Sequence, residues 1–186
     1  VFLADTGGTI TKSASWQYLE PGTVASVTPA EGQVGTTVVI EGTSLFAGGA
    51  SIATIVLDGT EVASIAAGYN NTYIEVVVAR ADESAAVGDI VLTSDIGTVL
   101  VGENVFSYLA EGDVADVSPN SGRVGTTASI TGTGLRGGGD EILSVTLGGA
   151  TATIDSENAS YVAITVPDGD AEADGEVDIV MTSDSG

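Results

Sequence analysis

Apolar residues recur at every second position in several stretches of this chain. The pattern runs from Ile74 to Val78 and returns from Val162 to Val166. Because successive side chains of a strand point to opposite faces, this period of two predicts strands with one buried face. We find no helical periodicity, and the many β-branched residues and glycines disfavour helix. The strands predicted between turn residues lie near 23–28, 35–42, 52–58, 61–66, 72–79, 87–94 and 98–108.

The same order of residues occurs more than once along the chain. Val24–Pro29 returns as Val114–Pro119, so the period is about 90 residues. The start of the chain belongs to the same series, because Val1–Gly7 matches both Val91–Gly97 and Val180–Gly186. Self-similarity at a fixed period is typical of an array of similar units, which builds length or surface.

The period divides the chain into three segments. We expect residues 1–21 to be the C-terminal strands of a preceding repeat, residues 22–110 to be a complete repeat, and residues 111–186 to be a repeat without its last strand. The chain begins and ends at the same point of the period. The simpler explanation is that it is cut from a longer array, and the alternative is that terminal strands are exchanged between chains. The short junctions favour a semi-rigid rod in which each unit advances by about 35 to 45 Å.

Charge narrows the classes of function. The 26 acidic residues outnumber the four basic ones and give a formal charge of −22, so the chain has no basic face for nucleic acid. Repulsion between these negative charges is best tolerated in salt, which screens it, so the charge favours a saline, extracellular setting. No apolar run approaches the roughly 18 to 20 residues that a membrane helix needs. With no cysteine and no histidine, disulfides, thiolate metal sites and the commonest catalytic base are excluded.

The order of key residues resembles the IPT/TIG immunoglobulin-like domain. The order is Val-x-x-Val-x-Pro, then Gly-x-x-Gly-Thr-x-x-x-Ile-x-Gly-Thr, a Gly-rich turn, Val-x-Leu-x-Gly and an aromatic-x-Tyr pair. The residues that carry it are Val24, Val27, Pro29, Gly32, Gly35, Thr36, Ile40, Gly42, Leu45, Leu57, Gly59 and Tyr108, and in the second copy Val114, Val117, Pro119, Gly122, Gly125, Thr126, Ile130, Gly132, Leu135, Leu147 and Gly149.

The resemblance implies an all-β chain of tandem immunoglobulin-like (IPT/TIG, E-set-like) β-sandwiches. Such domains occur in cell-surface receptors, in Rel-type transcription factors and beside polysaccharide enzymes, and long tandem arrays occur in giant extracellular surface or adhesion proteins of protists and algae. Two features depart from the pattern. Leu45 and Leu135 stand where many members carry Phe, and the cysteines of the receptor versions are missing.

Two sequons for N-glycosylation occupy equivalent places. Asn70-Asn71-Thr72 and Asn158-Ala159-Ser160 each lie directly before a tyrosine that begins a predicted strand. A sequon is an acceptor in the secretory route when its turn is exposed, so Asn70 and Asn158 are candidate glycosylation sites. The alternative is that these residues simply suit a tight turn by hydrogen bonding to the local backbone.

The acidic stretch from Asp168 to Gly175 is a candidate calcium loop. Carboxylates at every second position can converge on one hard cation if the loop curls. The stretch lacks the twelfth-position Glu and the flanking helices of an EF-hand, so a solvated acidic loop is the alternative reading. The candidate ligands are Asp168, Asp170, Glu172 and Asp174, and no other cofactor is expected.

Two further patterns have simple structural interpretations. The glycines at 48–49 and 137–139 lack the lysine and the helix of a phosphate-binding loop and are interpreted as flexible turns. Trp16 and Tyr18 align with Phe106 and Tyr108, and because positions i and i+2 share a strand face, we expect both pairs to pack in a core.

These observations favour a structural and adhesive role without enzymatic activity. We expect a stiff, acidic, N-glycosylated rod or filament of a large extracellular protein, such as a surface fibre or flagellar hair. Its partners would be neighbouring repeats, other copies in a filament and attached glycans, without nucleic acid and without membrane insertion. The alternative is an accessory module that binds carbohydrate or protein within a secreted multidomain protein.

Overall fold

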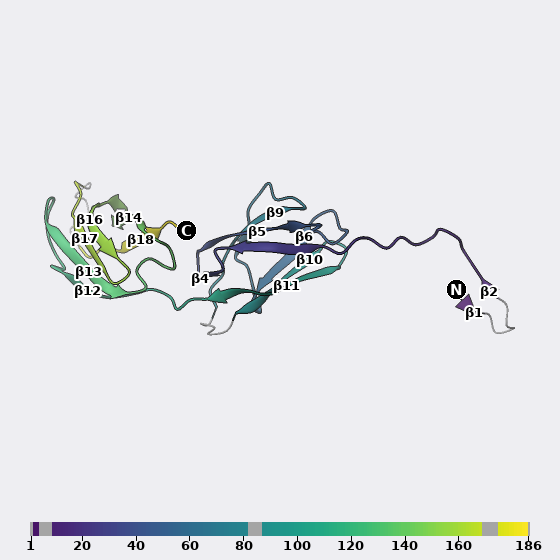
Figure 1. Cartoon of the computed structure of the whole chain (residues 1–186). Helices are drawn as coiled ribbons and strands as arrows, with labels where there is room; N and C mark the ends of the chain where they lie inside the picture. The colour runs from purple at the N-terminus through teal and green to yellow at the C-terminus, as the bar shows by residue number, and fades with distance from the viewer. Residues whose placement is uncertain (1, 4–8, 82–86, 169–174, 186) are drawn as a thin grey trace.

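The computed structural model describes residues 2–3, 9–81, 87–168 and 175–185. Its secondary structure is β throughout these ranges. Figure 1 shows two β-bodies arranged end to end, with an extended N-terminal segment on the far side of the first. We call residues 22–110 the first unit and residues 111–186 the second unit. None of the described residues forms a helix of the length and apolarity needed to cross a membrane.

The first unit is a sandwich of two sheets. One sheet has the order β3-β5-β9-β8 and the other β4-β11-β10-β6-β7. Inward-facing side chains of both sheets form one core that includes Ile40, Ile74, Ile90 and Phe106, all fully buried. The strands are β3 (Thr23–Thr28), β4 (Glu31–Gly32), β5 (Thr37–Thr43), β6 (Ile52–Leu57), β7 (Thr60–Glu61), β8 (Ser64–Ile65), β9 (Tyr73–Val77), β10 (Gly88–Ser94) and β11 (Val99–Tyr108).

The predicted strands agree with those observed, with two differences. The single strand expected near 61–66 is two short strands, β7 and β8, which belong to different sheets. The second difference is β4, which the sequence did not predict. It has two residues and exists through parallel pairing with the end of β11, a contact that local sequence does not encode.

The second unit repeats this arrangement with fewer strands. Its sheets have the orders β12-β13-β17-β16 and β15-β14-β18. Among the described residues, no strand follows β18, so the position that β11 takes beside β10 has no counterpart here. The strands are β12 (Asp113–Ser118), β13 (Thr127–Thr133), β14 (Ile142–Leu147), β15 (Ala150–Thr151), β16 (Thr153–Asn158), β17 (Tyr161–Thr165) and β18 (Ile179–Ser183).

The N-terminal segment contains a small antiparallel pair, β1 (Phe2–Leu3) and β2 (Thr9–Ile10). Its register joins Phe2 to Ile10 and Leu3 to Thr9. In the aligned part of the first unit, β10 and β11 pair Leu92 with Leu100 and Thr93 with Val99. The backbone pairing of the segment therefore matches that of the closing strands of the first unit.

Candidate functional site: the sequon turns and the junction between units

The first sequon forms an exposed turn before β9. The Oδ1 atom of Asn70 accepts hydrogen bonds from the backbone N–H of Thr72 at 2.9 Å, the Thr72 hydroxyl at 2.8 Å and the backbone N–H of Tyr73 at 3.1 Å. The neighbouring Asn71 Oδ1 accepts a bond from the backbone N–H of Phe46 at 2.8 Å. The turn is thus held by side-chain oxygens, and Asn70 itself remains exposed.

The second sequon has the same geometry. Asn158 is exposed, and its Oδ1 accepts bonds from the Ser160 backbone N–H at 2.9 Å and the Ser160 hydroxyl at 3.0 Å. Both interpretations of the sequons, as glycosylation sites and as tight turns, are compatible with this geometry. The hydrogen bonds serve the turn, and the exposed side chains leave Asn70 and Asn158 accessible. Their glycosylation stays a prediction.

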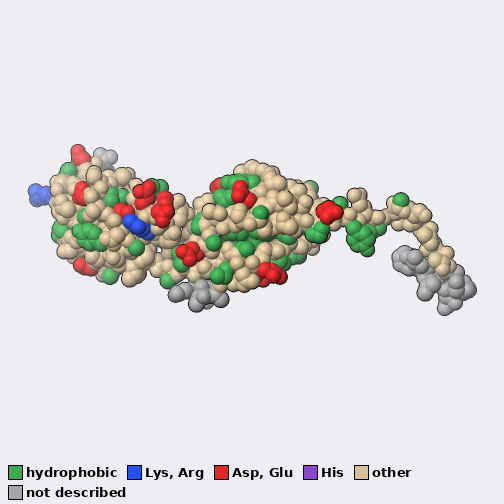
Figure 2. All heavy atoms as spheres, in the orientation of Figure 1, with side chains coloured by type: hydrophobic (Ala, Val, Ile, Leu, Met, Phe, Trp, Pro, Cys, Tyr) green, Lys and Arg blue, Asp and Glu red, His purple; other side chains and the backbone are tan. Residues whose placement is uncertain are grey.

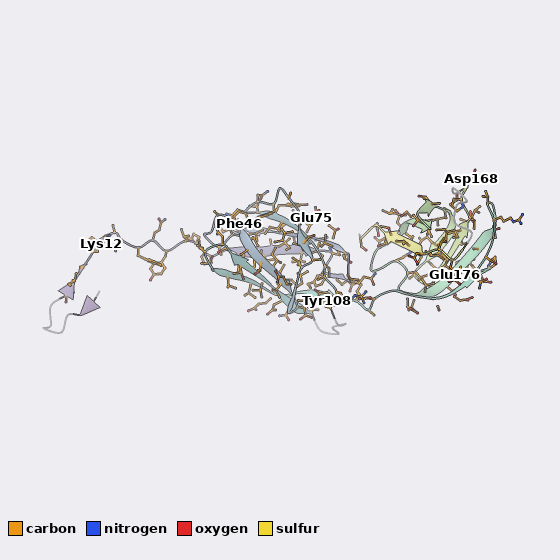
Figure 3. The ribbon with its side chains drawn as sticks, turned by 180° about the vertical axis from the view of Figure 1, so that it is seen from behind. Lys12, Phe46, Glu75, Tyr108, Asp168 and Glu176 are labelled. Atoms are coloured by element: carbon orange, nitrogen blue, oxygen red, sulfur yellow. The ribbon has the colours of Figure 1, made fainter. Side chains whose placement is uncertain are left out.

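The acidic stretch is only partly described. Asp168 is exposed at the end of the segment that follows β17 (Figure 3), whereas Asp170, Glu172 and Asp174 lie outside the described residues. Within the described ranges, acidic side chains do not gather in a group of three that could hold a metal ion. The calcium site stays a prediction for this stretch.

The two aromatic pairs differ, and for one of them the sequence prediction was wrong. Phe106 and Tyr108 are 0% and 3% exposed, with ring centroids 5.3 Å apart, as expected for core residues. Trp16 and Tyr18 are instead 79% and 90% exposed on the thin N-terminal segment, where Figure 2 shows apolar side chains projecting into solvent. Among the described residues, β1 and β2 form a separate two-stranded sheet that is not paired with the sheets of either unit, so the two rings stay exposed.

An ion pair that the sequence did not predict lies in the second unit. Arg136 donates from Nε and Nη2 to the carboxylate of Glu157 at 2.9 and 2.7 Å. Its equivalents in the first unit are Phe46 and Tyr69, whose rings meet edge to face at 5.8 Å. The bonds from Arg136 lower the pKa of Glu157, partial burial opposes this effect, and Glu157 in turn raises the pKa of Arg136. Comparing the two units position by position would have suggested the pair.

The glycine-rich turns have a role at the ends of the units. A Cβ atom on Gly138 would lie 2.7 Å from Cδ1 of Leu109, so the linker leucine rests directly on this glycine. The aligned Gly48 has the same relation to Leu19, at 2.5 Å. Both glycines have a φ of +91°, a conformation that other residues rarely adopt. The prediction of turns is confirmed, but these turns also receive the preceding linker.

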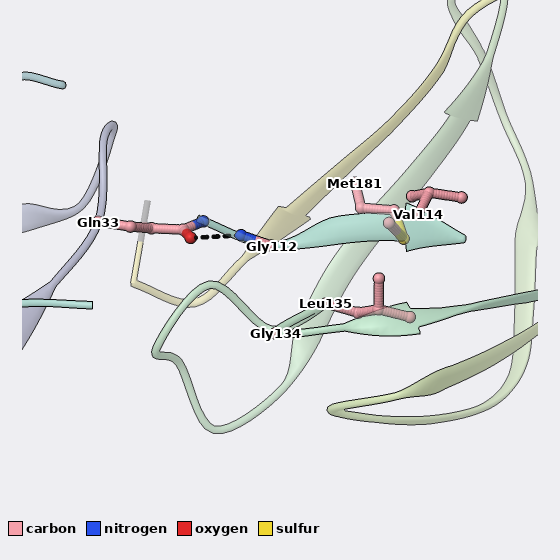
Figure 4. Close-up of a pocket in the computed structure, with 6 residues that line it drawn as sticks. All are labelled: Gln33, Gly112, Val114, Gly134, Leu135 and Met181. Carbon is pink, nitrogen blue, oxygen red and sulfur yellow. Dashed lines mark hydrogen bonds between the residues drawn. The ribbon is translucent and has the colours of Figure 1, made fainter. Parts of the chain in front are cut away.

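Hydrogen bonds join the first unit to the second at the same place. Gln33 Oε1 accepts a bond from the backbone N–H of Gly112 at 2.8 Å (Figure 4), and the Thr37 N–H donates to the carbonyl of Ser185 at 2.7 Å. A small hollow of about 140 Å³ lies behind these contacts, between Gln33 and Met181. Arg80 pairs with Glu111 at 3.0 Å, but this exposed pair adds little stability.

Comparison with known proteins identifies the family. The IPT/TIG domain model matches twice, at residues 23–108 and 114–186, and the chain belongs to this family of non-enzymatic immunoglobulin-like domains. The expected tandem of immunoglobulin-like sandwiches is thereby confirmed. No curated protein matches the sequence significantly.

Solved structures of one extracellular region show the same fold at low sequence identity. The extracellular region of plexin A4 matches in two structures, with 20% identity over 95% of this chain (TM-score 0.53) and 22% identity over 81% (TM-score 0.52). This chain spans only 19% and 13% of those plexin chains. A surface glycan-binding protein from Prevotella bryantii matches with 17% identity over 90% of this chain and 41% of its own, at a TM-score of 0.39.

Proposed function

We propose that this chain is a structural and adhesive segment of a large extracellular repeat protein, in which tandem IPT/TIG units form a stiff acidic rod. In this proposal, residues 1–21 are the closing strands of a preceding repeat and residues 111–186 belong to a repeat that lacks its last strand. The observation that carries the proposal is the repeated junction, in which Leu19 rests on Gly48 just as Leu109 rests on Gly138.

The junction contacts restrict motion between the units. Each unit has its own core, so only the linker and the contacts between the units oppose bending of one unit relative to the other. There, Leu109 continues directly from β11, and its N–H donates to the Gly32 carbonyl at 2.8 Å. The linker is thus bonded to the first unit and packed on the second. Because the same leucine and glycine occur at both junctions, every junction of such an array would have a similar angle.

Surface charge supports an extended array in salt. Acidic side chains are spread over both units and basic ones are few (Figure 2), in agreement with the formal charge of −22. Repulsion between units of the same sign opposes their collapse onto one another, and salt at about 0.15 M screens it beyond about 8 Å. Glycans at Asn70 and Asn158 would add further bulk to the exposed turns.

The stiffness of the junction can be measured with spin labels. The chain has no native cysteine, so Ala63→Cys and Ser156→Cys place one exposed label site in each unit. Double electron–electron resonance should give a narrow distance distribution, which Leu109→Ala broadens. Leu143→Ala, at an exposed leucine away from the junction, is the matched control and should leave the distribution narrow. An equally broad distribution in the unsubstituted and Leu109→Ala chains would refute the rod.

Glycosylation is tested separately by expression in a eukaryotic secretory host. We expect intact mass to show glycan on Asn70 and Asn158, and Asn70→Gln or Asn158→Gln to remove one glycan each. Unmodified asparagine at both positions would leave only the turn interpretation, and it would not bear on the stiffness of the junction.

The alternative function, an accessory carbohydrate- or protein-binding module, is supported by one observation. Trp16 and Tyr18 are exposed aromatic side chains, as sugar-binding surfaces require. Their rings meet edge to face with an interplanar angle of 77°, so they do not form a flat platform. Glycan-array binding that Trp16→Ala or Tyr18→Ala abolishes would favour this alternative over the rod.

A further inference from the structure

Each sequon asparagine has a tyrosine directly opposite it across the turn. Asn70 pairs with Tyr73 in an antiparallel bridge, and Asn158 pairs with Tyr161 where β16 meets β17. Residues paired in this way lie on the same face of the two strands, with Cβ atoms about 5 Å apart. The fold therefore places a tyrosine side chain beside both candidate glycosylation sites.

Both tyrosines lie on the outer face of their sheet. Tyr73 is 37% exposed and Tyr161 is 38% exposed, whereas the residues that follow them, Ile74 and Val162, are fully buried in the cores. This difference follows from the strand period, because successive side chains point to opposite faces. A ring with more than one third of its residue exposed offers apolar surface to a group attached nearby.

The turn leaves the amide nitrogen of each asparagine accessible. The side-chain hydrogen bonds that Asn70 and Asn158 make to the described residues all use Oδ1 and leave Nδ2 without one. An N-linked glycan is attached at Nδ2. The turn can therefore keep its side-chain bonds when a sugar is present.

The two tyrosines share a ring but not a polar partner. The Tyr73 hydroxyl donates to Glu75 at 3.0 Å. The residue that aligns with Glu75 is Ala163, so Tyr161 lacks this acceptor. The property that both turns have in common is thus the aromatic face of the tyrosine.

The residue before each asparagine does not repeat between the units. It is Tyr69 in the first unit, where its ring packs on Phe46, and Glu157 in the second unit, where it pairs with Arg136. These side chains give the two sequons different surroundings on that side. A role common to both sequons therefore falls to the tyrosine across the turn.

We propose that Tyr73 and Tyr161 bind the innermost sugar of the glycans on Asn70 and Asn158, with one face of the sugar packed on the aromatic ring. The ligand is an N-acetylhexosamine, whose axial C–H groups form an apolar surface that suits the negative face of an aromatic ring. The inference rests on the glycosylation that is part of the proposed function, and it adds where the attached sugar lies.

The hydrogen bonds of the turn favour this contact. Three bonds hold Oδ1 of Asn70, and two hold Oδ1 of Asn158. Because Oδ1 and Nδ2 belong to one planar amide, fixing the oxygen also fixes the nitrogen that carries the sugar. The sugar is thus held beside the ring before it packs, and little conformational freedom remains to be lost.

The contact determines which face of each unit the glycans cover. Tyr73 and Tyr161 lie on the sheets that contain β9 and β17. In the first unit, the exposed Val99 and Val101 belong to the other sheet. A sugar packed on Tyr73 leaves that other sheet uncovered.

Nuclear magnetic resonance of the glycosylated 186-residue chain tests the contact. The chain is secreted from a eukaryotic host and treated with an endoglycosidase that leaves one N-acetylglucosamine on each asparagine. Because each sugar lies on an aromatic face, its proton signals should move upfield relative to those of free glycosyl-asparagine. Signals of both sugars at the positions of glycosyl-asparagine would overturn the proposal.

Substitution of the tyrosines assigns the shift to the ring. Tyr73→Ala should abolish the shift of the sugar on Asn70 and leave that on Asn158 unchanged, and Tyr161→Ala should do the reverse. Each variant is therefore the control for the other. Tyr73→Phe keeps the ring and should keep the shift. A shift that survives in Tyr73→Ala, or that is lost in Tyr73→Phe, would overturn packing on the aromatic face.

Thermal melting gives a second readout of the same contact. The chain made in a bacterial host without glycosylation is compared with the glycosylated chain of the same sequence. Glycosylation should raise the melting temperature of the unsubstituted chain more than that of the variant with both Tyr73→Ala and Tyr161→Ala. An equal rise in the two sequences would show that the sugars do not use the rings.

Intact mass separates the two ways in which the proposal can fail. Unmodified Asn70 and Asn158 would overturn both the glycosylation and the contact. One sugar on each asparagine without an upfield shift would overturn the contact alone and leave the glycosylation in place.

Discussion

Two neighbouring aromatic residues of β11, Phe106 and Tyr108, have different roles in the first core. Phe106 is fully buried and apolar. The Tyr108 hydroxyl is also buried, but it makes no well-formed hydrogen bond to a described residue. Burial raises the pKa of Tyr108, and the nearby Thr60 offsets this rise only in part. A buried hydroxyl without a partner costs stability, whereas the ring beside it contributes stability.

This difference predicts opposite effects of substitution. Tyr108→Phe removes the unsatisfied hydroxyl and should leave the free energy of unfolding of the first unit equal or higher. Phe106→Ala should lower it by about 3 to 5 kcal/mol, as expected for a large cavity in a core. Urea denaturation followed by circular dichroism measures both. A clear loss of stability in Tyr108→Phe would show that the hydroxyl has a partner in solution.

The pair of Arg136 and Glu157 predicts a pH dependence of the second unit. The bonds from Arg136 lower the pKa of Glu157 in the folded state. The stability from this shift is present above the unfolded pKa of about 4.3 and is lost as pH falls through the lower folded pKa. Urea midpoints between pH 3 and 7 should therefore converge at low pH for the unsubstituted chain and Glu157→Gln. A difference that persists at low pH would assign the effect to packing.

At the scale of single strands, glycines determine how closely neighbouring strands approach. A Cβ atom on Gly42 would collide with the carbonyl oxygen of Thr23 and lie 2.7 Å from Leu45. Gly132 has the same relation to Asp113 and Leu135. In each unit this close contact lies beside a register shift in a strand pair, which is β3 with β5 in the first unit and β12 with β13 in the second. The close approach is therefore a feature of the fold of both units.

Alanine at either glycine should therefore destabilise its unit. Because the colliding atom is a backbone oxygen, relief requires a shift of the neighbouring strand, and we expect Gly42→Ala or Gly132→Ala to cost about 1 to 3 kcal/mol. Thermal melting measures the loss. Gly175→Ala is the control, since a Cβ there meets no atom of the described part of the chain within 4 Å. Unchanged melting of both variants would show that the strands separate without cost.

At the same scale, sequence reasoning located most strands and missed the shortest ones. Alternation places Ile74 and Val76 on one face of β9 whatever surrounds them, so local pattern suffices. The division of residues 61–66 into β7 and β8 depends instead on which sheet each end joins. Pairings between distant segments decide this, and local alternation does not contain that information.

At the scale of the whole molecule, charge and length act together. With 26 acidic and four basic residues, self-repulsion opposes folding and association at low ionic strength. We expect the melting temperature to rise between about 0.01 and 0.15 M NaCl, over which the screening length falls from about 30 to about 8 Å. A melting temperature independent of salt would show that the carboxylates are too far apart to interact.

The junction was predictable only in outline. The short linkers indicated restricted motion, but nothing in the turn at 137–139 indicated that Gly138 receives Leu109. The bond from Gly112 to Gln33 joins residues 79 positions apart, so it also required the structure. By contrast, the bonds that Asn70 Oδ1 accepts are local, since their donors lie only two or three residues further along the chain.

The sequence by itself determined the β class, the period, the family and the acidic surface of this protein, because alternation, repetition and composition are properties of neighbouring residues and of counts. The tertiary structure decided which distant residues meet. Gln33 and Gly112 are 79 positions apart, yet they share a hydrogen bond at the junction, and the neighbouring strands β7 and β8 belong to different sheets. The physical reason is that such contacts depend on how the whole chain packs, and local pattern does not contain that information.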